Sequence, residues 1–79
     1  MLFVTNIYTD GFGERMCNIG SDNGVIELWE FANKFTPSPP IKAGLNKIPN
    51  CQIDKHNREI AIRMGAIEVD IDDFEKFCN

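Results

Sequence analysis

Residues 57–74, "NREIAIRMGAIEVDIDDF", change their hydrophobic period at Gly65. Before this glycine the apolar residues recur three and four positions apart, as on one face of a helix. After it they alternate with acidic residues, as in a half-buried strand. The stretch therefore predicts a helix over about 55–64 and a strand over 66–71. Asp54 precedes the helix as its N-cap, and Gly65 is expected to take the left-handed backbone that ends it.

The flanking segments complete a small α+β order. A hairpin over 2–19 turns through the glycines of "DGFGE", a helix over about 22–35 follows, and a proline-rich loop occupies 36–50. A short helix over 72–78 closes the chain. We therefore expect one α+β domain over residues 1–79, with a small three-stranded mixed sheet and two to three helices packed on one face.

The helix expected over 22–35 carries an apolar stripe at helical spacing. Its members are Val25, Leu28, Trp29, Ala32 and Phe35. Ser21 or Asp22 is placed to cap the first turn. We expect Trp29 to lie in the core. The alternative is a half-exposed Trp29 beside Glu30 that serves as an interface anchor.

Length and composition exclude several classes of protein. A chain of 79 residues buries a small core, which leaves little room for a deep catalytic cleft. No run approaches the roughly 18 apolar residues of a membrane span, and the first residues lack the features of a signal peptide, so we expect a cytoplasmic protein. Cys17, Cys51 and Cys78 are odd in number, and we expect them reduced. Cys17 and Cys51 should be buried, and Cys78 should oxidise most readily.

The titratable residues form no recognised catalytic or metal motif. His56, the only histidine, is expected in solvent. A zinc site with Cys51 and Cys78, or a Cys–His nucleophilic pair, has no supporting spacing or orienting group. "DGFGER" lacks the pattern of a phosphate-binding loop, and the acidic run after residue 66 lacks the turn glycine of a calcium loop. We predict no catalytic residue, no metal and no cofactor.

Charge is unevenly distributed along the chain. Residues 1–30 hold five acids and one base (net −4), 31–65 hold two acids and six bases (net +4), and 66–79 hold five acids and one base (net −4). One interpretation is a mixed, solvated surface. The other is a docking protein whose charged faces steer a partner. The candidate partner-binding residues are Trp29, Lys42, Lys47, Arg58, Arg63, Glu68, Asp70, Asp72 and Asp73.

The net charge of −4 and the lack of aromatic residues among the basic ones argue against nucleic acid as a partner. Some of the C-terminal acids also have a structural explanation. Asp72 or Asp73 can cap the last helix and favour its positive end.

Several short motifs occur in a recognisable order. They are "LFVTNIY" (2–8), "CNIGSD" (17–22), "ELWEFA" (27–32), "CQID" (51–54) and "REIAIRMGAIEV" (58–69). Together they resemble the domain-of-unknown-function family four thousand and thirty-one, which contains small bacterial and phage proteins. The resemblance covers nearly the whole chain and implies a compact α+β fold, often in a phage or mobile-element setting. It brings no assigned activity.

The chain departs from that family at three positions that are usually histidine. They are Asn18, Trp29 and Gln52 here. Amide side chains form hydrogen bonds, but they do not titrate near neutral pH and they ligate zinc poorly. Any metal binding or proton transfer by those histidines is therefore lost in this chain.

We expect a small non-enzymatic module that binds a host or self protein, as a phage or mobile-element accessory protein. An inhibitor of a host defence complex fits this description. The less favoured alternative is a small enzyme or nucleic-acid-processing factor with a polar site at Asn18, Gln52, Asp54 and Arg58, which would have to line one concavity. The third is a homodimer that uses the sheet edge or Trp29.

Overall fold

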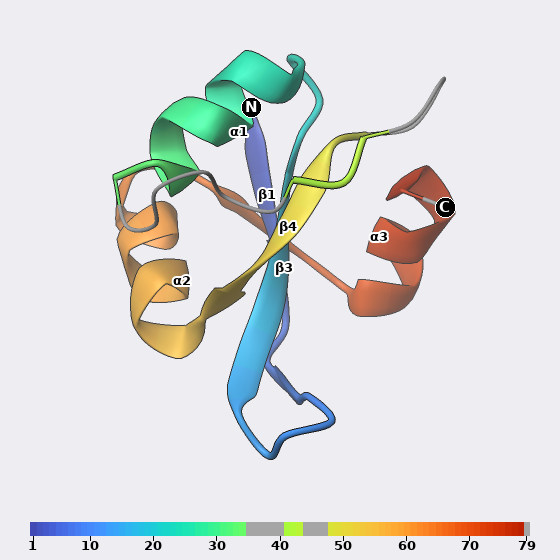
Figure 1. The fold of residues 1–79 in the computed structure, drawn as a ribbon. Coiled ribbons are helices and arrows are strands. Elements are labelled where there is room, and N and C mark those ends of the chain that lie inside the picture. Colours follow the sequence, from blue (N-terminus) through green and yellow to red (C-terminus); the bar gives the residue numbers. More distant parts are fainter. Residues whose placement is uncertain (35–40, 44–47, 79) are drawn as a thin grey trace.

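Five strands and three helices follow one another along the chain (Figure 1). A computed structural model describes residues 1–34, 41–43 and 48–78, with side chains up to residue 74. The elements are β1 (Leu2–Thr5), β2 (Tyr8–Thr9), β3 (Arg15–Ser21), α1 (Val25–Ala32), β4 (Asn50–Asp54), α2 (Lys55–Arg63), β5 (Ile67–Val69) and α3 (Ile71–Cys78).

β3 is the organising strand of a mixed five-stranded sheet. It pairs antiparallel with β4 along one side and with both β1 and β2 along the other. Met16, for example, pairs with Tyr8 on one side and with Asp54 on the other. β5 adds to β1 in parallel, so β4 and β5 form the two edges.

A bulge separates β1 from β2. Between the pairs Val4–Ile19 and Tyr8–Met16 lie residues 5–7 on one strand but only residues 17–18 on the other. This extra residue shifts the register by one position, which is the defining property of a β-bulge. The backbone N–H of Asn18 donates to Oγ1 of Thr5 at 3.0 Å, so a side chain supplies the hydrogen bond where the ladder is interrupted.

Helices cover both faces of the sheet. Figure 1 shows α1 and α2 on one side and α3 on the other. The α+β class with a mixed sheet is confirmed, and two helices share one face as expected. The sheet has five strands instead of three because the bulge divides the first strand and residues 50–54 form a full strand. In β4, Cys51 and Ile53 are buried while Gln52 and Asp54 are exposed, the alternation of a strand with one covered face.

The core lies between the sheet and the pair α1 and α2. Its members are Val4, Cys17, Ile19, Leu28, Phe31, Ala32, Cys51, Ile53 and Ala61. A second, smaller contact holds α3, whose Phe74 ring lies over Gly20 of β3. The expected burial of Cys17 and Cys51 is confirmed.

The predicted helix signals were correct for α2 and wrong for α1. Oδ1 of Asp54 accepts from the backbone N–H of Asn57 at 2.8 Å, and Gly65 has a φ of 99° after the helix ends. In contrast, α1 begins after Gly24 without a side-chain cap. Ser21 cannot cap α1 because it ends β3, where its Oγ accepts from the N–H of Asn23.

The last helix is not capped by Asp72 or Asp73, as expected, but by an earlier residue. Oδ1 of Asp70 accepts from the N–H of Asp72 at 2.9 Å, so Asp70 is the capping residue. Asp72 and Asp73 lie in the first turn, where their charges favour the positive helix end. Much of the proline-rich segment expected over 36–50 lies outside the described residues, as does Phe35, and its end forms β4 from Asn50 onward.

Candidate functional site

Three polar side chains from three strands meet on the sheet face that carries α3. Asn18 of β3 and Gln52 of β4 are direct cross-strand partners. The hydroxyl of Tyr8 in β2 donates to Oδ1 of Asn18 at 2.7 Å and accepts from Nε2 of Gln52 at 3.1 Å. The phenol therefore links the two amides into one network.

This network borders a cavity of about 280 Å³. The lining residues are Tyr8, Asn18, Lys42, Asn50, Cys51 and Gln52. Lys42 is held beside β4 because its backbone N–H donates to the carbonyl of Asn50 at 2.7 Å and its carbonyl accepts from the N–H of Asn50 at 2.9 Å. It is the one charged side chain among these lining residues.

The bulge explains why Tyr8 reaches this network. Paired residues in antiparallel strands point to the same face, and a shift of one residue exchanges the faces. In the register of β1, residue 8 would oppose Arg15 and turn its side chain away from Asn18. With the bulge, Tyr8 opposes Met16 and shares the face of Asn18.

The four-residue polar site expected from the sequence is divided by the structure. Asn18 and Gln52 come together, whereas Asp54 and Arg58 do not line the cavity. Asp54 caps α2. The geometry therefore does not assemble the concavity that the alternative enzymatic function needs. Sequence reasoning missed Tyr8 and Asn50, because nothing local to either residue shows the bulge or the bridge that places them there.

Arg58 joins α2 to the sheet. Its Nε donates to the carbonyl of Thr5 at 2.8 Å, and its Nη2 forms an ion pair with Oε1 of Glu68 at 2.7 Å. Its side chain is 15% exposed. The guanidinium thus satisfies a backbone carbonyl at the bulge and ties the edge strand β5 to the helix.

Three apolar side chains are exposed together on α1. Val25, Ile26 and Trp29 have exposed fractions of 45%, 69% and 47%. Residues three and four apart in a helix are neighbours on its surface, so Trp29 lies beside both Val25 and Ile26. We call these three residues the α1 patch. Trp29 was expected in the core, and this was wrong because α1 turns Leu28, Phe31 and Ala32 inward instead.

Glu27 and Glu30 directly follow Ile26 and Trp29 of the α1 patch in the sequence, and Glu27 shares the Met1 ammonium with Asp22. The Met1 ammonium donates to Oδ1 of Asp22 at 2.8 Å and to Oε1 of Glu27 at 2.7 Å, and the Ser21 hydroxyl donates to the same Glu27 oxygen at 2.6 Å. The hydrogen bond from the ammonium, and to a smaller extent the one from Ser21, lower the pKa of Glu27. The carboxylate of Glu30, one residue after Trp29, makes no hydrogen bond or ion pair within the described residues.

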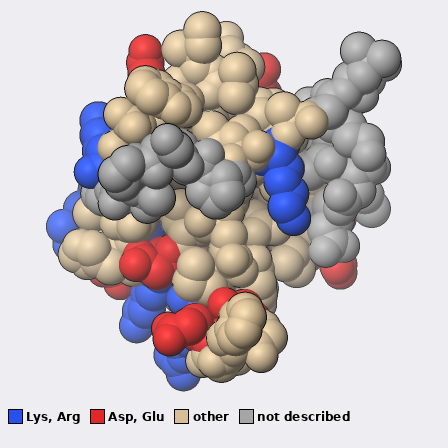
Figure 2. Space-filling model, viewed as in Figure 1, with Lys and Arg blue, Asp and Glu red and all other residues tan. Residues whose placement is uncertain are grey.

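The remaining charged candidates are scattered over the surface. Lys42, Arg63, Asp70, Asp72 and Asp73 are all exposed. Lys47 lies outside the described residues. Figure 2 shows basic and acidic side chains interspersed on one face rather than a field of one sign. Arg58 of α2 and Glu68 of β5 form an ion pair where the basic helix and the acidic strand meet.

Neither of the two described cysteine thiols ionises readily. Burial raises the pKa of the Cys17 thiol to about 12 and that of Cys51 to about 11. A thiol must ionise to act as a nucleophile or metal ligand, so neither group is activated. Among residues 1–34, 41–43 and 48–74, no three His, Cys, Asp or Glu side chains form a cluster suited to a metal ion.

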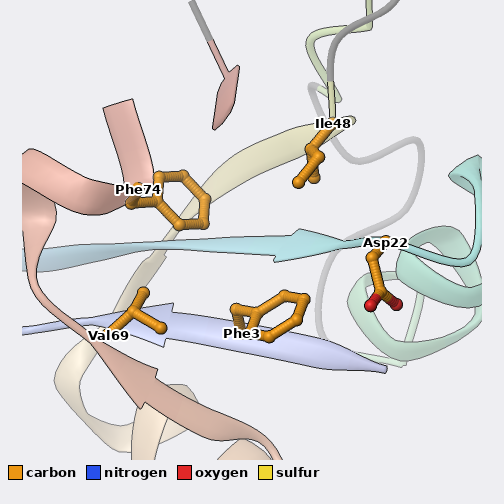
Figure 3. A pocket seen from close by; sticks show the side chains of 5 residues that line it. All are labelled: Phe3, Asp22, Ile48, Val69 and Phe74. Atoms are coloured by element: carbon orange, nitrogen blue, oxygen red, sulfur yellow. The ribbon is translucent and has the colours of Figure 1, made fainter. Parts of the chain in front are cut away.

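An apolar pocket of about 250 Å³ lies between α3 and the sheet. Figure 3 shows Phe74 of α3 and Phe3 and Val69 of the strands around this space, with Ile48 and Asp22 at its far side. Asp22 is the one charged residue among the described lining residues, and its Oδ1 already accepts from the Met1 ammonium. The pocket therefore offers few polar groups to orient a ligand.

Comparisons with protein-family models, with curated proteins and with solved structures found no match. The family resemblance noted in the sequence therefore stays a prediction. In the part of the chain that the structure describes, no helix has the length and apolar character to cross a membrane.

Proposed function

We propose that this chain is a small non-enzymatic module that binds another protein through the α1 patch. One observation carries the proposal: Trp29, 47% exposed, lies on the outer side of α1 together with Val25 and Ile26. Isolated exposed apolar residues are common and mean little. A contiguous group that contains a tryptophan is typical of the centre of a protein–protein interface.

The partner that fits this surface is a protein with an apolar groove and a basic rim. Glu27 and Glu30 directly follow Ile26 and Trp29 of the patch along α1, and the whole chain has a net charge of −4. Opposite charge around an apolar centre raises the association rate and disfavours wrong partners. A second copy of this chain fits less well, because it would bring the same acidic rim against itself.

The setting of this interaction follows from the sequence resemblance alone. It favours a phage or mobile-element accessory protein that acts on a host protein, of which an inhibitor of a host defence complex is one example. The polar cavity on the other sheet face supports the alternative of a small enzyme only weakly, since Asp54 and Arg58 serve structural roles.

The test is affinity capture from the host cell with wild-type protein and three variants. Trp29→Ala and Ile26→Ser remove parts of the α1 patch. Met64→Ala is the matched control, because Met64 is an exposed apolar side chain, at 55%, located after α2. We expect one stoichiometric partner with basic surface to be captured by wild type and by Met64→Ala.

Trp29→Ala should weaken this binding at least tenfold, which corresponds to about 1.4 kcal/mol or more. Its unfolding transition should stay close to that of wild type because Trp29 is outside the core. Capture of the same proteins in the same amounts by wild type and by Trp29→Ala would overturn the proposal. So would a stable homodimer in light scattering that Trp29→Ala dissociates.

A further inference from the structure

The polar cavity next to Tyr8 lies on the sheet face that carries α3, and none of the described residues of α3 lines it. Gly20 of β3 lies under the ring of Phe74. Asn18, two residues earlier, points to the same face and lines the cavity instead. Polar residues on an uncovered strand face usually meet water alone, but here Asn18, Tyr8 and Gln52 hold one another in a fixed arrangement through two hydrogen bonds.

This arrangement leaves hydrogen-bonding groups directed at the cavity. A neutral primary amide has two N–H donors and an acceptor oxygen. Gln52 uses Nε2 to donate to Tyr8, and within the described residues its Oε1 accepts no hydrogen bond. Asn18 uses its Oδ1 to accept from Tyr8 and keeps its two Nδ2 donors. Donors and an acceptor side by side match the edge of a planar nitrogen heterocycle, as amide side chains do when they read nucleobases.

The charge and size of the cavity narrow the class of ligand. Lys42 contributes a positive charge, and none of the described residues that line the cavity is acidic, so these residues favour an anion. A volume of about 280 Å³ is at the lower end for small-molecule sites, so a single base fills it while a ribose and phosphate remain at the rim. We propose that this cavity binds a mononucleotide, with its base against the amides of Asn18 and Gln52 and its phosphate at Lys42.

The experiment is amide NMR titration of the full chain with each of the four ribonucleoside monophosphates, with a nucleoside and with inorganic phosphate. We expect saturable shifts of the side-chain amides of Asn18 and Gln52 from at least one mononucleotide. Gln52→Leu should weaken this binding about tenfold. Lys42→Gln should remove the preference for nucleotide over nucleoside. Lys55→Gln, an exposed lysine on α2 outside the cavity, is the matched control and should bind as wild type does.

Three results would overturn this inference. The first is no saturable shift from any mononucleotide at about 10 mM. The second is binding of phosphate alone at the same residues with equal strength. The third is binding that Gln52→Leu leaves unchanged, with its amide spectrum showing an intact fold. None of these results bears on the α1 patch, which lies on the helix of the opposite sheet face.

Discussion

Replacement of Gly20 by alanine tests how closely α3 is packed on the sheet. A Cβ at this position would lie 2.9 Å from Cζ and 3.0 Å from Cε2 of Phe74, and 3.2 Å from the carbonyl oxygen of Pro49. Real Cβ contacts are longer, so the ring must move or the strand must shift. Overpacking of this kind costs about 1–3 kcal/mol.

A second effect opposes this cost. Exchange of glycine for alanine restricts the unfolded chain and stabilises a compatible site by about 0.4–1 kcal/mol. We therefore expect Gly20→Ala to lower the free energy of unfolding by about 1–2 kcal/mol. In a domain of this size, the melting temperature should fall by about 4–8 °C for each kcal/mol.

Urea unfolding of wild type, Gly20→Ala, Gly11→Ala, Phe74→Leu and the Gly20→Ala/Phe74→Leu double variant measures this effect and its origin. Gly11→Ala is the matched control, since no atom lies within 4 Å of a Cβ there, and it should equal or exceed wild type. The cost of Gly20→Ala should fall by at least about 0.5 kcal/mol when Phe74 is already leucine, because the smaller side chain can yield. A Gly20→Ala protein as stable as wild type, or an equal cost in both backgrounds, would refute the packing of α3 described above.

Five further substitutions probe three other features by the same unfolding measurement. Arg58→Met should lower the free energy of unfolding by about 1–3 kcal/mol, because it leaves the Thr5 carbonyl without its donor. Glu68→Gln changes the exposed side of the ion pair and should cost less than about 1 kcal/mol. Equal costs would contradict the view that the bond to the Thr5 carbonyl matters more than the ion pair. Asp54→Ala should cost about 1 kcal/mol through loss of the α2 cap, while Asp54→Asn, which still accepts from the first turn, should cost little. Burial raises the pKa of the Cys51 thiol from 9.0 to about 11, so the stabilisation by the buried, protonated thiol is present below pH 9 and is lost as the pH rises toward 11. Cys51→Ala should therefore reduce the fall of the unfolding free energy between these pH values. An unchanged slope would argue that the thiol is accessible to ionisation in the folded state.

The sequence predicted α2 well because two independent signals agree there, whereas the strand expected over 66–71 is limited to Ile67–Val69 in β5, and Ile71 already begins α3. The period of the apolar residues changes at Gly65, and the cap at Asp54 and the glycine at the other end mark the same helix. Each of these features acts over a few residues, so no long-range contact is needed to specify it.

The face of α1 was not predictable in the same way. Six of the eight residues in "VIELWEFA" are apolar, so several stripes fit one helix. The structure buries Phe31 and exposes Trp29, a choice that depends on how α1 lies on β3. Periodicity identifies a helix in such a segment but cannot orient it, and the α1 patch was therefore found only as an alternative.

Half of the candidate polar site followed from the sequence. Asn18 and Gln52 were identified because they replace histidines of the family that the chain resembles, and strand pairing places them opposite each other. Asp54 and Arg58 were grouped with them through motif membership, which does not determine where a side chain points. Tyr8 joins the site only because of the shift between β1 and β2.

Because of that shift, the polar site depends on the number of residues between β1 and β2 more than on which residues they are. The number of residues between β1 and β2 decides which sheet face carries the Tyr8 side chain. With the present number it lies on the face of the cavity, and with one residue fewer it would lie on the face of the core. Substitutions within residues 5–7 alter local contacts but keep the count. Removal of one residue there would turn every side chain of β2 to the opposite sheet face. This short segment can therefore change its residue types but not its length.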